Sequence, residues 1–433
     1  MSTLLLALFA SASLTGCAAP SDTGEALVNG PMPDVAPPTP SLRRLTATQY
    51  NNVVVDLFGD GLVLPSSLEP DVKAEGLLQV GNATSSVSAL GVERYEDAAV
   101  LIAEQVAEDP DRLAAVGSRM ILANACHLHD RPGEGVVADL GGLHRFMNWD
   151  GPILTDSGGY QVFSMLDIAE LDEEGVNFRS PIDGRRLRLG PVESADIQLA
   201  LDSDIAMVFD HCPPLPAEPK LLETAVRRTT RWARTALEHH RATSTRGQAL
   251  FAIVQGGLDD ALRRRSAEEL TALDFDGFAM GGLSVGESPE QLHAASRAYA
   301  PLLPAHRLRY LMGIGRPRDV LEAIASGFDV FDCVLPTRNG RHGSLFTPEG
   351  TIHLRNKRFR SATGAADPEC DCETCAQWDL GVLRHLVMAG EPLGRMLCSL
   401  HNLRFMHRLV ADARVAVQEG RFDAFYAERC TRC

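Results

Sequence analysis

Seven short apolar runs recur between residues 120 and 340, and each run ends in polar residues or glycine. Stretches with apolar residues at helical spacing separate them. This alternation of strands and helices is typical of a parallel sheet covered by helices. The sequence therefore predicts an α/β fold, with the runs beginning at Met120, Pro152, Ile205, Leu250, Gly277, Arg309 and Val330.

Polar groups at the carboxyl end of each strand are what a (β/α)8 TIM barrel uses to build its active site. A closed barrel needs eight strands, and only seven runs are evident, so the first strand is expected to be missing or replaced. Gly76 to Ala83 could supply it, although this stretch is better explained as part of a helical segment. An open barrel would leave two unpaired strand edges, a large cost beside the ~5 to 15 kcal/mol that keeps a domain folded. The residues expected to converge on one rim are Asn124, Asp156, Asp210, Gln255, Gly282, Gly313 and Asp332.

The N-terminal quarter has a different character. Residues 1–17 contain an apolar segment ending in L-T-G-C, which resembles a bacterial lipoprotein signal but lacks the usual positively charged start. A working export signal with Cys17 as the lipid site, a mis-called start and a fused remnant all remain open. No other stretch is apolar for ~18 residues, so no transmembrane span is expected.

Three further regions follow this segment. Residues 18–41 are rich in Pro, Ser and Gly and are interpreted as a linker. Residues 42–111 have helical spacing and resemble a small helical module of unknown function near the front of some exported bacterial proteins. Residues 112–430 hold the predicted barrel, with a C-terminal metal-binding subdomain over about 355–430.

The net charge of −16 argues at first against a nucleic-acid partner. The charge is unevenly distributed, however, because residues 1–111 carry 15 acidic and 4 basic side chains, a balance of −11. Residues 335–360 carry six basic side chains and only Glu349 as an acid. A local basic surface is therefore expected in the C-terminal half.

Four residues near the C-terminus have the spacing of a zinc site. Cys370, Cys372 and Cys375 form a C-x-C-x-x-C cluster, and His401 follows beyond an intervening helical stretch. Three thiolates and one imidazole complete a tetrahedral set for Zn²⁺ and leave no open coordination position. We therefore expect one structural zinc ion.

From about Arg112 to Arg421, the chain resembles the bacterial tRNA-guanine transglycosylases, or queuine tRNA-ribosyltransferases. The resemblance rests on "LGGLHRFMNWDGPILTDSGGYQVFSM", "GFAMGGLSVGE", "FDCVLPTRNGR" and "CDCETC" followed by "LHNLRF". It implies a cytoplasmic, zinc-containing pentosyltransferase that exchanges the wobble guanine, position 34 of G-U-N anticodons, for the queuosine precursor preQ1. It also implies that tRNA is the partner and that the chain forms a homodimer through the zinc region.

The resemblance implies a double displacement at the ribose. Asp332 corresponds to the nucleophile that attacks C1′, and Asp156 to the general acid/base that takes a proton from the incoming base. Two carboxylates acting in this way follow the logic of retaining glycosidases. By the same resemblance, Gly158 and Gly159 keep side chains out of the volume of the substrate.

The resemblance further implies how the base and the RNA are bound. Asp210 and Gln255 would read the base edge, Gly282 would donate a backbone N–H, and Tyr160 and Met312 would sandwich the ring. Cys212 and Val285 would favour preQ1 over the larger queuine, and Glu287 would help to accept its aminomethyl group. The substrate-binding set is Ser157, Gly158, Gly159, Tyr160, Asp210, Cys212, Gln255, Gly282, Val285, Glu287 and Met312. The RNA-binding set is Gly313, Arg316, Asp319, Thr337, Arg338, Asn339, Gly340 and Arg341.

Two departures from the family pattern bear on substrate affinity. The family string is usually "FDEC", whereas His211 follows Asp210 here, and "ANACHL" from Ala123 to Leu128 lacks an aromatic ring found in the family. Two other functions remain open: a catalytically inactive, exported, zinc-binding lipoprotein-like remnant, and a retaining sugar hydrolase. The second is disfavoured because 3 Trp and 6 Tyr offer few sugar-stacking platforms.

Overall fold

The computed structural model describes residues 46–58, 68, 94, 116–163 and 169–430. The chain divides into two compact units, Met1–Asp109 and Pro110–Cys433. In the first unit, helix α1 (Ala47–Phe58) is described, and it buries Tyr50 and Val54 four positions apart on one face. The proposed signal, the linker, most of the helical module and the strand considered at residues 76–83 lie outside the described residues.

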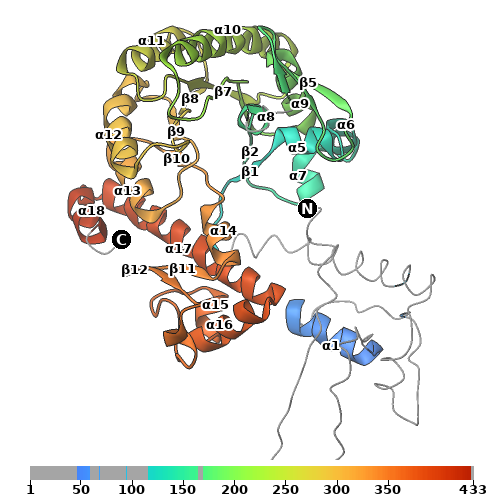
Figure 1. Ribbon diagram of the computed structural model, residues 1–433, viewed down its shortest axis with the longest axis vertical. Coiled ribbons are helices and arrows are strands. Elements are labelled where there is room, and N and C mark those ends of the chain that lie inside the picture. The colour runs from blue at the N-terminus through green and yellow to red at the C-terminus, as the bar shows by residue number, and fades with distance from the viewer. Residues whose placement is uncertain (1–45, 59–67, 69–93, 95–115, 164–168, 431–433) are drawn as a thin grey trace, which may run out of the picture. The chain divides into compact units, whose positions relative to one another are not determined.

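The second unit is built on a parallel sheet of seven strands, drawn in Figure 1. Each predicted apolar run coincides with one strand, to within one residue at the start, and the strands lie side by side in chain order. The TIM-like α/β fold predicted from the sequence is thus confirmed. Within the described residues, β1 and β10 form the two edges of the sheet, and no eighth strand pairs with either. The strands are β1 (Ile121–Ala123), β2 (Ile153–Thr155), β6 (Ile205–Met207), β7 (Ala249–Val254), β8 (Gly277–Met280), β9 (Leu308–Leu311) and β10 (Val330–Phe331).

Helices follow the strands and cover the outside of the sheet, as α10 to α13 show in Figure 1. Four of these α-helices, α9, α10, α12 and α13, have proline in the first turn, where the missing N–H costs nothing. Ser288 and Gln291 form a capping box on α12, and Gly327 in the left-handed region ends α13. These sequence signals explain where the helices begin and end. The helices are α9 (Pro191–Leu201), α10 (Pro219–Thr243), α11 (Asp260–Thr271), α12 (Pro289–Tyr299), η2 (Ala300–Leu302) and α13 (Pro317–Ser326).

A smaller layer surrounds β1 and β2. Its antiparallel sheet of β3 (Ala169–Leu171), β4 (Val176–Arg179) and β5 (Arg186–Leu189) was not predicted. Val176 and Phe178 on β4 are buried and alternate with exposed neighbours, the period-2 pattern of a half-buried strand. They pack in a core with Trp149 and Trp232. The helices of this layer are α5 (Ala125–Asp130), α6 (Glu134–Asp139), α7 (Gly142–Met147) and α8 (Gly159–Phe163).

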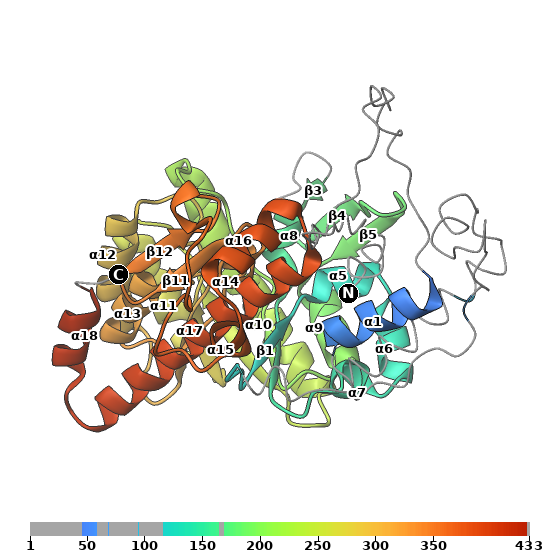
Figure 2. The same ribbon diagram turned by 90° about the horizontal axis from the view of Figure 1, so that it is seen from below.

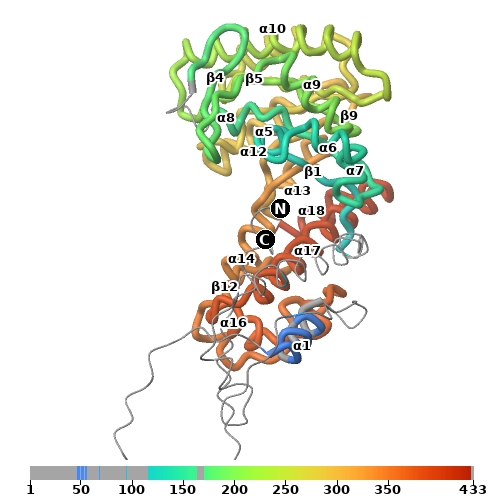
Figure 3. Tube along the Cα trace, turned by 90° about the vertical axis from the view of Figure 1, so that its right-hand side faces the viewer, coloured from blue at the N-terminus to red at the C-terminus, as the bar shows by residue number. Residues whose placement is uncertain are grey.

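The C-terminal subdomain gathers around one long helix, α17, which packs against α13, α14, α15, α16 and β11 (Figures 2 and 3). It has a small core of its own that includes Leu345, Leu383 and Leu397. None of the described helices is both long and apolar enough to cross a bilayer. The elements are α14 (Leu335–Arg341), β11 (Ser344–Thr347), β12 (Gly350–His353), η3 (Lys357–Phe359), α15 (Glu373–Gln377), α16 (Leu380–Ala389), α17 (Pro392–Gln418) and α18 (Phe422–Cys430).

Candidate active site

Asp156, the residue directly after β2, lies in a dense set of hydrogen-bond donors. Its Oδ2 accepts from Asn124 Nδ2 at 2.5 Å and from Gln161 Nε2 at 3.0 Å. Its Oδ1 accepts from the backbone N–H groups of Ala125 at 3.0 Å and Gly158 at 3.2 Å. The parallel pairing of β1 with β2 brings Asn124 beside Asp156. These donors fix the carboxyl group in one orientation.

Burial raises the pKa of Asp156 to about 7, the donors from Ala125 and Gly158 oppose this shift, and the charge of Asp332 adds to it. The two aspartates therefore lie within electrostatic range of each other, although Asp156 follows the second strand of the parallel sheet and Asp332 follows the last. A carboxyl group with a pKa near 7 can both donate and accept a proton at neutral pH.

Asp332, the residue directly after β10, is held by β9 and its loop. Its Oδ1 accepts from the hydroxyl of Tyr310 at 2.6 Å and from the backbone N–H of Gly313 at 2.8 Å. Burial, followed by the charge of Asp332, raises the pKa of Tyr310 well above its ordinary value, so this hydroxyl stays a donor. One oxygen of Asp332 is thus anchored, and Oδ2 has no partner within the described residues.

Two buried polar side chains meet at the ends of β6 and β7. Gln255 Nε2 donates to Asp210 Oδ2 at 2.7 Å, and the Ser157 hydroxyl donates to Asp210 Oδ1 at 3.4 Å. Burial raises the pKa of Asp210 to about 6. Burial also raises the pKa of the neighbouring Cys212 thiol to about 12, so it is a neutral wall of this site.

Arg263, on α11, is a fully buried cation beneath these strand ends and was not expected from the sequence. It donates to the carbonyl oxygens of Val254 at 2.7 Å, Gly257 at 2.8 Å and Gly282 at 3.2 Å. Burial lowers its pKa to about 10, so the guanidinium remains charged at neutral pH. Arg263 thereby fixes the loops that follow β7 and β8.

The loop after β8 is closed by Glu287. The carboxylate accepts from the backbone N–H of Ser284 and, at 3.1 Å, from that of Val285. Ser284 has a φ of 60°, in the left-handed region, and its hydroxyl donates to the Gly313 carbonyl at 3.0 Å. Both Glu287 oxygens are therefore occupied by the chain itself. Met312 is half-buried against the barrel core, whereas Tyr160 is 56% exposed.

The structure explains why glycine is needed at positions 158 and 159 even without a bound substrate. Gly158 has a φ of 78°, and a Cβ there would lie 2.9 Å from Cys126 Cβ. A Cβ at Gly159 would lie 2.8 Å from both the carbonyl oxygen and Oδ1 of Asp210. The protein itself excludes side chains at both positions, whatever the substrate requires.

His211, the departure from the family pattern, forms a buried network of its own. Its backbone N–H donates to Thr229 Oγ1 at 3.0 Å, and its Nδ1 lies 3.1 Å from Arg228 Nη1. Arg228 Nη2 donates to Glu173 at 2.5 Å in the turn between β3 and β4. Burial, with the charge of Arg228 adding to it, lowers the pKa of His211 to about 4, so the imidazole is neutral. The network ties the end of β6 to the antiparallel sheet.

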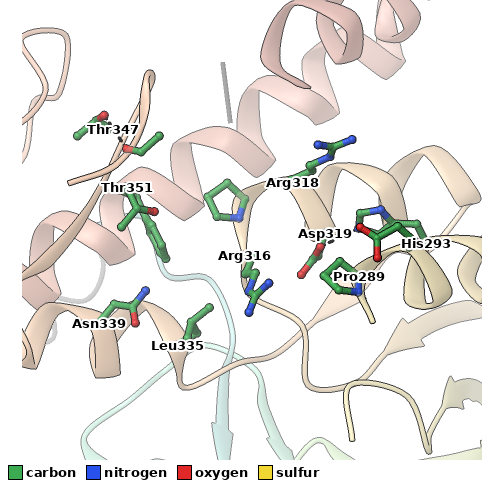
Figure 4. A pocket seen from close by; sticks show the side chains of 13 residues that line it. Pro289, His293, Arg316, Arg318, Asp319, Leu335, Asn339, Thr347 and Thr351 are labelled. Carbon is green, nitrogen blue, oxygen red and sulfur yellow. Dashed lines mark hydrogen bonds and ion pairs between the residues drawn. The ribbon is translucent and has the colours of Figure 1, made fainter. Parts of the chain in front are cut away.

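A pocket of about 460 Å³ opens beside the segment that follows Asp332 (Figure 4). Three members of the predicted RNA-binding set line it, and Arg316 lies between Asn339 and Asp319 in this view. Asp319 is paired with His293 at 2.7 Å. The catalytic candidates Asp156 and Asp332 do not line this pocket. Its walls come from Pro289, Glu290, His293, Arg316, Pro317, Arg318, Asp319, Leu335, Asn339, Phe346, Thr347, Gly350 and Thr351.

The other RNA-binding candidates lie on or near α14. Arg338 and Arg341 are exposed there, and Gly313 is exposed in the loop after β9. Thr337 donates its hydroxyl to the Val334 carbonyl at 3.2 Å. Gly340 is buried, so it serves helix packing.

The predicted zinc ligands come together. The ligand atoms of Cys370, Cys372, Cys375 and His401 all lie within 4.8 Å of one another, so the cluster can hold one metal ion. His401 Nδ1 is 3.2 Å from Cys375 Sγ and 3.8 Å from Cys372 Sγ. Tetrahedral Zn²⁺ with Zn–S of ~2.3 Å separates its ligand atoms by roughly 3.5 to 3.8 Å, which fits these residues. His401 Nε2 lies 2.8 Å from the Phe346 carbonyl oxygen and can donate to it, which leaves Nδ1 for the metal.

A family model described as queuine tRNA-ribosyltransferase matches residues 101–433. The chain belongs to this family. Queuine tRNA-ribosyltransferases of Nitrosomonas europaea and Thiobacillus denitrificans are each 49% identical to it, over 316 and 321 residues. These matches cover 73% and 74% of this chain and 84% and 87% of the relatives. The relative from Moorella thermoacetica is 47% identical over 319 residues, covering 74% of this chain and 85% of its own.

A second family model, described as a protein of unknown function, matches residues 43–108. The N-terminal region is thus a module distinct from the ribosyltransferase part, as its resemblance to a helical module indicated. The resemblance noted for the C-terminal three quarters is confirmed, and the chain is a member of a glycosyltransferase family.

Proposed function

We propose that the chain exchanges the guanine at position 34 of tRNAs with G-U-N anticodons for preQ1, by double displacement through a covalent Asp332–ribose intermediate. The observation that carries this proposal is the pair of carboxyl groups from β2 and β10 within electrostatic range of each other. One has a pKa near 7, and the other has an anchored oxygen and a second oxygen left for attack.

In the first displacement, Asp332 Oδ2 attacks C1′ of the ribose as the bond to the guanine nitrogen breaks. Protonated Asp156 gives its proton to the leaving base and becomes a carboxylate. In the second displacement, this carboxylate takes the ring-nitrogen proton of the incoming base, whose nitrogen then attacks C1′ and releases Asp332. Two inversions restore the original configuration at C1′.

The buried pair of Asp210 and Gln255 supports recognition of a purine base through the hydrogen-bonding groups on its edge. Asp210 offers an acceptor, and Gln255 offers a carbonyl oxygen and a further N–H, in a site where a mismatched base would leave polar groups unpaired. Cys212 is buried beside Asp210, and the family resemblance implies that Cys212 and Val285 line the base site and favour preQ1 over the larger queuine. Because Glu287 binds the backbone of its own loop, it would act on the aminomethyl group by orienting that loop.

The surroundings of the site support tRNA as the partner. Arg338 and Arg341 on α14 and Arg316 beside the pocket are exposed guanidinium groups, which suit phosphates and guanine edges. The zinc ion would be structural, since its ligand set has no open position. We further propose that the chain acts in the cytosol, because lipid attachment at Cys17 would separate it from tRNA. We also propose that it forms a homodimer through the zinc region, as the family resemblance implies.

The proposal is tested with labelled guanine. Purified full-length protein is incubated with a G-U-N tRNA and radiolabelled guanine, and label in the tRNA is counted. We expect label in this tRNA, none in a matched tRNA with adenine at position 34, and release of label by unlabelled preQ1. Equal label in both tRNAs would contradict the assigned position, and no label in either would favour the inactive remnant.

The pH dependence of base incorporation tests the role of Asp156. The first displacement needs protonated Asp156 and the second needs its carboxylate, so with a pKa of about 7 the rate should be greatest near pH 7 and fall on both sides, approaching tenfold per unit. Single-turnover incorporation between pH 5 and pH 9 measures this. The residual rate of Asp156→Asn, which cannot titrate, should show no inflection near 7. An inflection that persists in this variant would assign the titration to another group.

A Gly159→Ala substitution is expected to lower base exchange by about 10- to 100-fold. The new methyl group would push on Asp210 Oδ1 and its carbonyl oxygen, and a displacement of ~1 Å at a positioned group can cost about 10²-fold. Exchange kinetics with guanine and preQ1 measure the loss. Gly135→Ala is the matched control, because Gly135, like Gly159, has an ordinary φ, and nothing lies within 4 Å of a Cβ there. Equal losses in both variants would show that the contact with Asp210 is not the cause.

A further inference from the structure

Asn402, the residue directly after the zinc ligand His401 on α17, is completely buried. Its Oδ1 accepts from the backbone N–H of Phe346 at 2.9 Å. Its Nδ2 donates to the carbonyl oxygens of Pro336 and Ser344, both at 2.9 Å. Both amide protons and one acceptor position are therefore used, and the side chain can take only one orientation.

These bonds connect three elements. Pro336 lies in the first turn of α14, four positions after Asp332, and Ser344 and Phe346 lie on β11. His401 Nε2 lies 2.8 Å from the carbonyl oxygen of the same Phe346 whose N–H binds Asn402. Consecutive residues of α17 thus hold both backbone polar groups of Phe346. The zinc ligand His401 and its neighbour Asn402 are therefore both anchored to the backbone of Phe346.

Helix α14 also rests directly on the backbone of α17. A Cβ at Gly340 would lie 2.6 Å from the backbone N of Ser399 and 2.7 Å from its Cα. The Ser399 hydroxyl lies 3.3 Å from the Thr337 carbonyl. The two helices are therefore in close contact, and a shift of α17 must move α14. The α14 residues Leu335 and Asn339 line the pocket beside Arg316, together with Phe346.

We propose that Asn402 is a positioning residue that couples the zinc-bearing helix α17 to α14, and so sets the position of the RNA-facing side chains after Asp332. The inference rests on the proposed function for its effect on tRNA. Without the Asn402 amide, the buried carbonyl oxygens of Pro336 and Ser344 lose a donor, and α14 keeps only the longer bond from Ser399 to Thr337 as a polar link to α17. The helix can then separate from its support although the metal is bound.

The Asn402→Asp variant tests this coupling, because it keeps the size of the side chain and the acceptor for Phe346 but loses both donors. We expect one zinc per chain, as in wild type, and faster amide hydrogen exchange over residues 335–341. We also expect the KM for tRNA to rise by about tenfold or more, with a smaller change in kcat. Leu409→Ala is the control: Leu409 is buried on α17 against Leu321, so this variant should lower stability without changing the KM.

Two results would overturn the inference: wild-type amide exchange over residues 335–341 in Asn402→Asp, or a KM that rises equally in Leu409→Ala. Zinc content and amide exchange are measured without tRNA, so they test the coupling even if the wild-type chain exchanges no base. If Asn402→Asp does not fold, Asn402→Ala, which has neither donor nor acceptor, is measured in the same way. Wild-type amide exchange in that variant would equally overturn the inference.

Discussion

The Asp332→Asn substitution is expected to lower base exchange by at least roughly 10³-fold, or ~4 kcal/mol of activation free energy. Asparagine has nearly the same size as aspartate and keeps an oxygen that can accept from the Tyr310 hydroxyl and the Gly313 N–H. The group left for attack would then be an amide nitrogen, which is not a nucleophile toward C1′. The fold and the anchoring bonds survive, while the first displacement has no attacking oxygen.

Two measurements separate this loss from a loss of binding. Labelled-guanine exchange gives the rate, and denaturing electrophoresis of protein mixed with labelled tRNA detects a covalent adduct, expected for wild type and absent for Asp332→Asn. Binding of tRNA should be almost unchanged. Asp274→Asn, at an exposed carboxyl paired with Arg241 and Arg307, is the matched control and should exchange normally. Exchange by Asp332→Asn within about tenfold of wild type would exclude Asp332 as the nucleophile.

The parallel sheet could be predicted because each strand carries two independent signals. The run ending at Asp156 and the run ending at Asp332 are both apolar over a few residues and then change abruptly to polar residues or glycine. The antiparallel sheet of β3, β4 and β5 has a weaker signal, because its strands are short and arginine occupies alternate positions on β5. Alternation over four residues is easily mistaken for a polar loop.

The site was only partly predictable. The sequence placed Asp156 and Asp332 at strand ends, but their roles came from the family resemblance. Their partners Gln161 and Tyr310 carry no sequence signal, because a hydrogen bond depends on where the backbone brings two side chains. Arg263 lies in a run of three arginines on an amphipathic helix, where a solvated position is the ordinary expectation for each. Its burial follows from the carbonyl oxygens that the β7 and β8 loops turn inward.

The second large expected effect is a loss of stability when a ligand of the zinc cluster is removed. A Cys375→Ser substitution replaces a thiolate with a hydroxyl, which is a poor ligand at neutral pH, and leaves Cys370, Cys372 and His401 as an incomplete set. The subdomain has only a small core, so metal binding contributes much of its folding free energy. We expect the zinc content to fall from one to near zero per chain and the Tm to fall by roughly 10 °C or more.

Cys398→Ala is the matched control for this prediction, because Cys398 is fully buried in the same subdomain but lies outside the ligand cluster. It should keep its zinc and lose about 1–2 kcal/mol of stability at most. Since His401 is both a ligand and a neighbour of Phe346, metal loss should also speed amide exchange over residues 335–341. A Cys375→Ser protein that retains one zinc and the wild-type Tm would show that three ligands suffice. The Cys375 thiolate would then contribute little to metal binding or to the stability of the subdomain.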